Sequence, residues 1–353
     1  MGGSVSHLGA FKRVSDIHIK GLNGIRTLCA LFVLWGHVSQ EALCGWKVVS
    51  LPLPECSAFV FFVISGFLAG YRIDGIKDVS SYYKKKVVRF FPLYYSYLIV
   101  SILVFVAIGQ SEQILAPRLV WYLCLMPQIP FCSHTGILPL LHLWFIGSLV
   151  IFYGLFPLFA KVKSHKRIAI AAIIAVIWLF FKLALRFFVG TGSFLYGFVR
   201  VTGLDILFAG VWAGLLWKEE NSFFTKLRGL TPLSIIAWIL FLFSGFYDKY
   251  IPAPIRADLL AALALVIIIT QQAESPFLNL EHRLFDWFGR ISYEVYVIQF
   301  IVLILLARVY SRIGIECSDF IIYFVCTAIV IGSAWCCNKV LAFLSVIHSN
   351  RNQ

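Results

Sequence analysis

Ten apolar runs, each about as long as a bilayer-spanning helix, occupy most of this chain. A helix needs roughly 20 consecutive, mostly apolar residues to cross the hydrocarbon core, and hydrophobic residues fill 60% of the 353 positions. The mean hydropathy of +0.88 lies far outside the range of soluble proteins. The sequence therefore predicts an all-α integral membrane protein, with a single membrane domain over residues 1–353 and no soluble domain. The predicted spans are residues 24–43, 55–74, 90–109, 138–160, 168–188, 196–217, 231–247, 257–272, 290–309 and 319–338.

The distribution of basic residues predicts the orientation. Thirty Lys and Arg against 17 Asp and Glu leave a net charge of +13, which in a soluble chain would suggest a nucleic-acid partner. In a membrane protein, Lys and Arg collect in cytoplasmic loops instead. With the N-terminus inside, 19 of the 30 fall in cytoplasmic segments, seven on the opposite side and four within or beside spans. Both termini are therefore expected in the cytoplasm, and no nucleic-acid partner is expected.

One further apolar segment, residues 117–131, is short and interrupted by proline. Counting it as a span would place the basic loop 161–167 on the outer side, against the charge distribution. It is therefore interpreted as a re-entrant or interfacial piece on the outer face. The first 23 residues are mixed and polar and lack a small-residue cleavage site, so no cleavable signal peptide is expected.

The nine cysteines include no CxxC pair, so no metal site is expected. Most fit small core positions. Cys44, Cys56 and Cys132 are exceptions because all three fall on the outer side of the predicted topology. In an oxidising compartment they could form a disulfide; free thiols are the alternative.

Charged side chains inside spans are costly and by default mark function. Arg26 and His37 lie eleven residues apart in the first span. An α-helix turns by about 100° and rises by about 1.5 Å per residue, so the two side chains point in directions about 20° apart and lie about 16 Å apart along the helix axis. They therefore share one face of the helix. Such a face could bind an anionic molecule from the cytoplasm through Arg26 and present its reactive end to His37. A histidine is suited to deprotonate a hydroxyl as general base. The alternative is a positive-inside anchor at Arg26 and a hydrogen-bonded interhelical residue at His37.

Other spans carry weaker signals. Ser65, Gly66 and Gly70 form a small-residue face that allows helices to approach closely. A run of four basic residues precedes the third span: Lys84, Lys85, Lys86 and Arg89. It could bind a phosphate, or it could simply be a basic cytoplasmic loop.

Near the outer boundary, His142 lies at the depth of His37, so the two could form a polar pocket. The neighbouring Trp144 is interpreted as an interface anchor. Lys182 and Arg186 share one face of their helix and are expected to extend outward to the interface. Asp205 and Arg200 are expected to reach neighbouring spans, and Glu294 and Gln299 fit interhelical hydrogen bonds. Glu41, four residues after His37, is a speculative orienting group for that imidazole.

The order of these motifs is more informative than any one of them. GIR with ten residues between Arg26 and His37 is followed by FFVISGFL, RFFPLYY, HLWF with FYGLFPLF, and GRISYEVYVIQ. This order resembles the acyltransferase 3 family of integral membrane O-acyltransferases, from residue 24 to about residue 300. The Arg-x10-His element is the most specific of these signatures. The count of ten spans with both ends inside agrees with what the family implies.

The resemblance implies transfer of an acyl group, usually acetyl, from cytoplasmic acyl-coenzyme A to a sugar hydroxyl of a surface or exported polysaccharide such as lipopolysaccharide O-antigen. The acceptor would be a glycan or lipid-linked oligosaccharide, and the location a bacterial inner membrane. His37 matches the family histidine, as general base or covalent acyl relay, and Arg26 its partner on the same helix. Lys86 and Arg89 match the family's Arg-x-x-Arg and would bind the phosphates of acetyl-coenzyme A.

Four positions depart from the family pattern. Lys86 replaces an arginine, which keeps the charge but loses the planar fork. Leu149 and Val150 stand where many members have acidic residues, and Gln299 where a histidine is common.

A transporter or flippase of a glycolipid or small anion, with His37, Arg26 and Glu294 along its path, is the alternative function. The absence of an internal repeat and the ordered motifs favour the enzyme.

Overall fold

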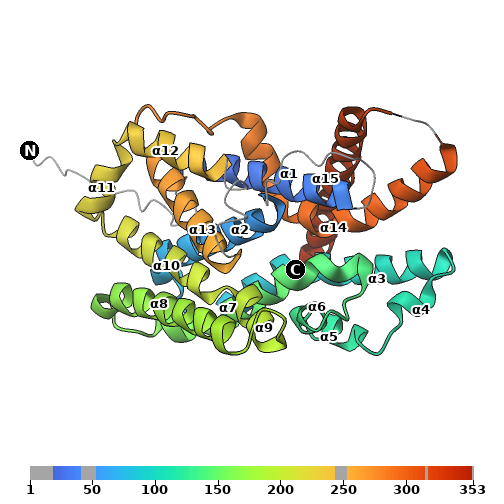
Figure 1. Cartoon of the computed structure of the whole chain (residues 1–353), viewed down its shortest axis with the longest axis horizontal. Helices are drawn as coiled ribbons and strands as arrows, with labels where there is room; N and C mark the ends of the chain where they lie inside the picture. Colours follow the sequence, from blue (N-terminus) through green and yellow to red (C-terminus); the bar gives the residue numbers. More distant parts are fainter. Residues whose placement is uncertain (1–18, 41–52, 243–252, 315–316, 352–353) are drawn as a thin grey trace, which may run out of the picture.

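The computed structural model describes residues 19–40, 53–242, 253–314 and 317–351, and within these ranges all regular structure is helical (Figure 1). The helices of the first half are α1 (Leu22–Gln40), α2 (Leu53–Tyr71), η2 (Ile73–Gly75), α3 (Val79–Ala107), α4 (Ser111–Ile114), α5 (Leu119–Leu123), α6 (Gln128–Cys132), η3 (Leu138–Leu143), α7 (Trp144–Ala160) and α8 (Ser164–Phe188). Those of the second half are α9 (Phe194–Thr202), α10 (Leu204–Lys218), α11 (Ser222–Arg228), α12 (Thr231–Leu242), α13 (Ala253–Thr270), α14 (Arg283–Ile313) and α15 (Asp319–Arg351).

A helix or a pair of consecutive helices occupies each of the ten predicted ranges. Among the described residues, six helical segments are long and apolar enough to cross a membrane: Val79–Ala107, Leu138–Ala160, Ser164–Phe188, Phe194–Lys218, Arg283–Ile313 and Asp319–Leu341. The all-helical, multi-pass architecture is thereby confirmed. The total of ten spans and the cytoplasmic side of both termini stay predictions.

Glycines let α2 and α10 cross in close contact. A methyl group added at Gly66 would meet the backbone oxygen of Leu207 at 2.0 Å, and one at Gly70 would meet that of Val211 at 2.3 Å. Gly210 and Gly214 face α2 in the same way. The small-residue face predicted on the second span is thus confirmed, since only a hydrogen atom fits between the two backbones.

One predicted boundary was wrong. The third span begins at Val79 rather than residue 90, because Asp78 caps the helix by accepting from the backbone N–H groups of Ser80 and Ser81. These bonds hold the pKa of the exposed Asp78 carboxyl below its ordinary value. The basic run at residues 84–89 consequently lies on a helix and not in a loop. The predicted span 196–217 matches the membrane-capable segment Phe194–Lys218, which consists of two helices that meet where Gly203 takes a left-handed backbone with φ of 58°.

The segment 117–131 contains two helices of five residues each, too short to span. It is tied to α3 and to the following turn through Tyr122. The carbonyl of Tyr122 accepts from the Tyr94 hydroxyl at 2.8 Å, and its own hydroxyl accepts from the backbone N–H of Ile137 at 3.1 Å. Cys132 at the end of α6 is a buried free thiol. Cys44 and the side chain of Cys56 lie outside the described residues, so a disulfide between those two stays a prediction.

Lys182 corrects another expectation: it does not extend outward, and its side chain is 2% exposed. Its ammonium donates to Asp205 at the start of α10 and, at 2.7 Å, to Asp258 of α13. The side chain of Asp205 is 3% exposed and that of Asp258 is 21% exposed. The helical pattern placed Lys182 on a face of α8 but did not show that two carboxylates from other helices meet it there. Asp205 does reach neighbouring helices, as predicted.

Replacing Lys182 is expected to destabilise the fold. In Lys182→Met two carboxylates lose their shared cation in a buried setting, and breaking such a pair costs about 3–5 kcal/mol. The midpoint of thermal unfolding of the purified protein checks this, with Lys166→Met at the exposed start of α8 as matched control. The triple variant that also carries Asp205→Asn and Asp258→Asn should recover part of the loss. An unchanged midpoint for Lys182→Met would contradict the buried triad.

Candidate active site

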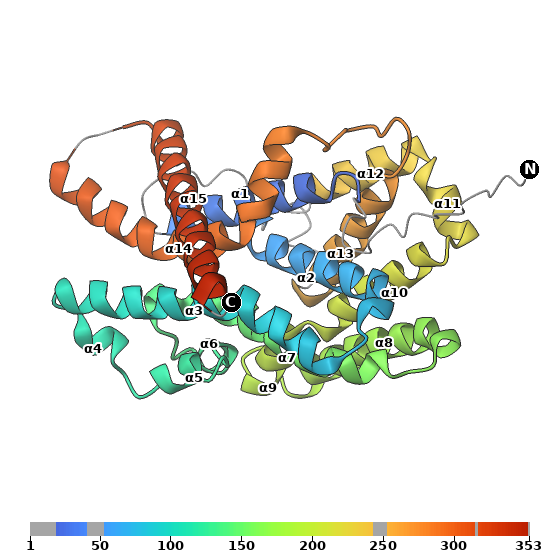
Figure 2. The same ribbon diagram turned by 180° about the vertical axis from the view of Figure 1, so that it is seen from behind.

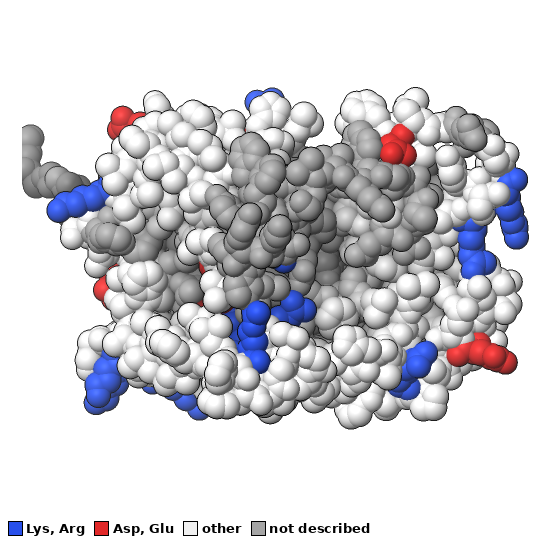
Figure 3. All heavy atoms as spheres, in the orientation of Figure 1, with Lys and Arg blue, Asp and Glu red and all other residues white. Residues whose placement is uncertain are grey.

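A cavity of about 780 Å³ opens among α1, α2, α3, α7 and α14. Its walls carry seven basic side chains and, among the described lining residues, one acidic side chain, Asp78. Figure 3 shows a small group of Lys and Arg atoms near the centre of the face that it draws, with others at the edges. The basic lining residues are Arg26, Arg72, Lys77, Lys85, Lys86, Arg89 and Arg290.

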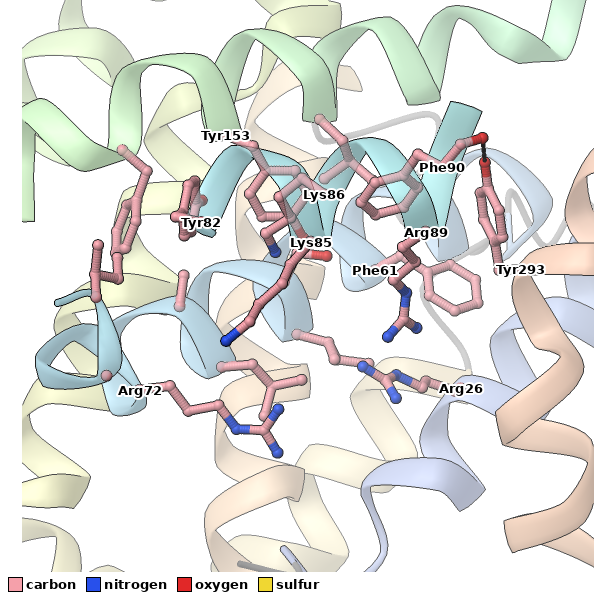
Figure 4. A pocket seen from close by; sticks show the side chains of 18 of the residues that line it. Arg26, Phe61, Arg72, Tyr82, Lys85, Lys86, Arg89, Phe90, Tyr153 and Tyr293 are labelled. Atoms are coloured by element: carbon pink, nitrogen blue, oxygen red, sulfur yellow. Dashed lines mark hydrogen bonds between the residues drawn. The ribbon is translucent and has the colours of Figure 1, made fainter. Parts of the chain in front are cut away.

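Two guanidinium groups face each other inside this cavity. Arg26 reaches in from α1 and Arg89 from α3, and Figure 4 shows their charged ends pointing toward one another. Arg26 donates to the side-chain oxygen of Asn23 at 3.4 Å. None of the ion pairs found among the described residues involves either arginine. Because like charges repel at short range in a partly buried site, this arrangement favours a bound anion between them.

Lys86 is held differently from Arg89. Its ammonium lies 3.6 Å from the centre of the Tyr153 ring and 5.4 Å from that of Tyr82, so it makes a cation–π contact with α7. Arg89 lies one turn further along α3 and is exposed to the cavity. Both residues predicted to bind the donor therefore line one cavity with Arg26. The sequence did not indicate Arg72 for this site, and it offered Lys85 only as part of the basic run; Figure 4 shows both pointing into the cavity.

The far wall of the cavity is aromatic. Phe145 of α7 and Tyr296 of α14 line it, with their ring centres 5.0 Å apart. Leu149, one of the positions that departs from the family pattern, lines it as well. Tyr296 also contacts His142: the ring centres lie 5.5 Å apart, and the tyrosine hydroxyl donates to the backbone oxygen of His142. The wall therefore separates the basic cavity from a histidine.

Behind this wall, His37 and His142 lie side by side, with ring centres 6.2 Å apart. Both rings pack on Phe300, at 4.9 and 5.2 Å. His142 Nε2 lies 2.9 Å from the backbone oxygen of Val297. A carbonyl can only accept, so Nε2 carries the proton and Nδ1 keeps its lone pair in the neutral ring. No described residue bonds the buried Nδ1 of either histidine.

Gln299, which replaces the common family histidine, is fully buried near His37, and its amide nitrogen donates to the backbone oxygen of Tyr296 at 3.1 Å. Its side-chain oxygen has no partner among the described residues. Two imidazole nitrogens and an amide oxygen in one buried cluster thus retain unused hydrogen-bonding capacity. Buried polar groups without partners are uncommon in native proteins, and such a cluster is suited to a polar reactant.

The structure separates the predicted roles along α1. Arg26 lines the basic cavity, whereas His37 is not among its lining residues and lies with His142, as the two-histidine pocket predicted. Trp144 packs against Phe131 and Phe62, and its role as an interface anchor stays a prediction.

The predicted interhelical role of Glu294 is confirmed by a 2.6 Å bond from Asn338 of α15. Glu41, the speculative orienting group for His37, lies outside the described residues.

A multi-pass helical domain with a basic cavity leading to buried imidazoles is suited to an anionic, activated co-substrate. Residues 19–339 match the family described as an acyltransferase domain. The chain belongs to this acyltransferase family, which confirms the resemblance found in the motifs.

Relatives carry more specific names. The chain is similar to the O-acetyltransferase OatA of Staphylococcus aureus strains NCTC 8325 / PS 47, COL and MRSA252, with 24% identity over 352 residues in each case. The match covers 90% of this chain and 56% of the relative, so the chain spans little more than half the length of these proteins. No solved structure matches it.

Proposed function

We propose that this protein is a membrane O-acetyltransferase, which transfers acetyl groups from acetyl-coenzyme A to hydroxyls of a surface or exported polysaccharide such as lipopolysaccharide O-antigen. The observation that carries the proposal is the basic cavity that ends at an aromatic wall in contact with a histidine pair. The name of the Staphylococcus aureus relatives supports the acetyl group and the oxygen acceptor. The proposed setting is a bacterial inner membrane, crossed ten times, with both termini in the cytoplasm.

In this proposal the donor binds at the cytoplasmic end. Its phosphates lie between Arg26 and Arg89, with Arg72 and Lys85 at the mouth of the cavity. Planar guanidinium groups bind phosphate oxygens in pairs, which suits the facing arginines. Lys86 adds charge from its place on Tyr153. The acyl end of the donor then extends past Phe145 and Tyr296 toward the histidines.

His37 acts as the general base. The hydroxyl oxygen of the acceptor attacks the thioester carbonyl carbon, a carbon–oxygen bond forms, and the carbon–sulfur bond breaks. The imidazole takes the hydroxyl proton, which finally passes to the departing thiolate. General-base catalysis by a positioned side chain contributes about 10²–10⁴-fold to such a step. His142 donates its Nε2 proton to the backbone oxygen of Val297. Its Nδ1 therefore keeps a lone pair, which gives the buried cluster around His37 a second hydrogen-bond acceptor.

The test is the acetyl content of surface polysaccharide from cells that carry the gene or an empty vector. Mass spectrometry should find an increment of one acetyl group per modified sugar only when the protein is present. If the wild-type protein reaches the membrane and adds no mass to any glycan, the transferase proposal fails and a transport function takes its place.

A further inference from the structure

An arginine outside the donor cavity ties two of its walls together. Arg167 lies in the first turn of α8, and its side chain is 16% exposed. Its Nε donates to the backbone oxygen of Val162 at 2.9 Å, its Nη2 to that of Ala160 at 2.9 Å, and its Nη1 to the carboxylate of Asp74 at 2.7 Å. One planar guanidinium group thus joins the end of α7 to the turn between α2 and α3.

Both segments that Arg167 joins belong to the wall of the donor cavity. Helix α7 provides four of the lining residues, from Phe145 to Phe156. Residues 72–78, which we call the entrance turn, provide Arg72 and Lys77 among others, and Figure 4 shows Arg72 pointing into the cavity. Asp74 lies between these two basic residues but is not among the lining residues. Its carboxylate is directed to Arg167 instead.

A second cation extends this connection to α10. Lys218, the last residue of α10, donates to the other carboxylate oxygen of Asp74. Figures 1 and 2 both show α10 beside α2, the helix that leads into the entrance turn. We call Asp74, Arg167 and Lys218 together the Asp74 brace. The brace connects the entrance turn to the ends of two neighbouring helices.

The arrangement of the brace indicates a role in positioning. Exposed ion pairs contribute little to stability on their own, but Arg167 also satisfies two backbone carbonyls at the end of α7, which have no helical partner. The guanidinium therefore has a fixed place from which to hold Asp74. A carboxylate beside a basic cavity repels an anion that enters it. Asp74 is thus expected to serve the position of the turn and not the charge of the site.

We propose that the Asp74 brace holds the entrance turn in place, so that Arg72 and Lys77 face the phosphates of the acyl donor. This inference rests on the proposed acetyltransferase function, because it concerns the donor cavity of that reaction. Asp74 and Arg167 do not line the cavity. They are positioning residues, which act on the donor through Arg72 and Lys77.

Calorimetric titration of coenzyme A into the purified full-length protein tests the brace. The protein is placed in phosphatidylcholine nanodiscs at constant ionic strength. Arg167→Gln and Asp74→Asn should each weaken binding by about three- to tenfold, because each breaks the contact that holds the turn. The first variant removes a positive charge and the second a negative charge, so charge alone would make Asp74→Asn bind the anionic donor more tightly. Unchanged or tighter binding in Asp74→Asn overturns the proposal.

Further variants separate geometry from charge. Lys166→Gln removes a positive charge at the neighbouring exposed position and should leave binding unchanged. Arg167→Lys keeps the charge but loses the planar fork, so it should weaken binding nearly as much as Arg167→Gln. The double variant with Asp74→Asn and Arg167→Gln should bind no more weakly than Arg167→Gln, since both changes break one contact. Full multiplication of the two single effects overturns the brace.

Hydrogen exchange of the entrance turn gives a second readout. The backbone N–H groups of Gly75 and Ile76 donate to the oxygens of Arg72 and Ile73 within the turn. Exchange at these amides should be faster in Asp74→Asn than in the wild type, and unchanged exchange would contradict the brace. In steady-state kinetics the same variant should raise KM for acetyl-coenzyme A and leave kcat unchanged.

The failure of the brace and that of the proposed function give different results. A wild type that transfers acetyl groups, together with an Asp74→Asn variant that binds coenzyme A normally, refutes the brace alone. A wild type that binds coenzyme A more tightly than Asp74→Asn but never transfers acetyl groups refutes the transferase function and supports the brace.

Discussion

His37→Ala is expected to lower acetyl transfer by about 10²–10⁴-fold, the contribution of a positioned general base. The imidazole lies beside His142 and against Phe300, with its Nδ1 free of any described partner. It is therefore placed to accept a proton rather than to support a neighbouring helix. The rate of acetyl transfer to polysaccharide, at saturating acetyl-coenzyme A, measures the effect.

The same variant should bind coenzyme A as the wild type does, since His37 is not among the residues that line the donor cavity. His165→Ala, at the exposed start of α8, is the matched control and should retain full activity. A loss of coenzyme A binding in His37→Ala would assign the histidine a structural role. Activity within threefold of wild type would remove His37 from the chemistry.

The second large effect is expected at the facing arginines of the donor cavity. Arg26→Ala and Arg89→Ala should each raise the KM for acetyl-coenzyme A by roughly 10- to 100-fold, because a hydrogen bond to a charged group contributes about 1.5–3 kcal/mol. The two guanidinium groups address one anion, so the double variant should lose less than the product of the single effects. Steady-state kinetics over a range of acetyl-coenzyme A concentrations measures these changes.

The basic run on α3 supplies its own control. Lys84 belongs to the same run as Lys85, Lys86 and Arg89 but is not among the residues that line the cavity. Lys84→Ala should leave KM unchanged, whereas Lys85→Ala at the mouth should raise it modestly. Equal effects of Lys84→Ala and Arg89→Ala would mean that α3 attracts the donor only through its total charge.

Hydropathy predicted where the helices lie, because a bilayer demands a long apolar run for each crossing. It could not predict what the helices bury against one another. Lys182 shows this limit: a lysine near a helix end most simply extends to the interface, and only the packing of α8 against α10 and α13 brings two carboxylates to it. The early start of α3 could have been predicted, since an aspartate such as Asp78 just before a helix is a capping signal.

Part of the candidate site could be predicted from the sequence. The spacing of Arg26 and His37 and the family motifs indicated a basic entrance and a deep imidazole. Arg72 was not assigned to it, and Lys85 only as one of two interpretations of the basic run, because the positive-inside rule explains basic residues near span ends equally well. Gln299 looked like the loss of a family histidine, yet the fold places its amide next to His37. Such partners lie on helices far apart in the chain, so local spacing carries no signal for them.

Transfer of radiolabelled acetyl groups by the purified protein tests the central claim most directly. The donor is acetyl-coenzyme A labelled in the acetyl group, and the acceptor is polysaccharide extracted from cells that lack the protein. The account predicts alkali-labile label, as expected of an O-acetyl ester, in the polysaccharide with the wild type and background label with His37→Ala. Equal label with both proteins, or none with a folded wild type that binds coenzyme A, would contradict it.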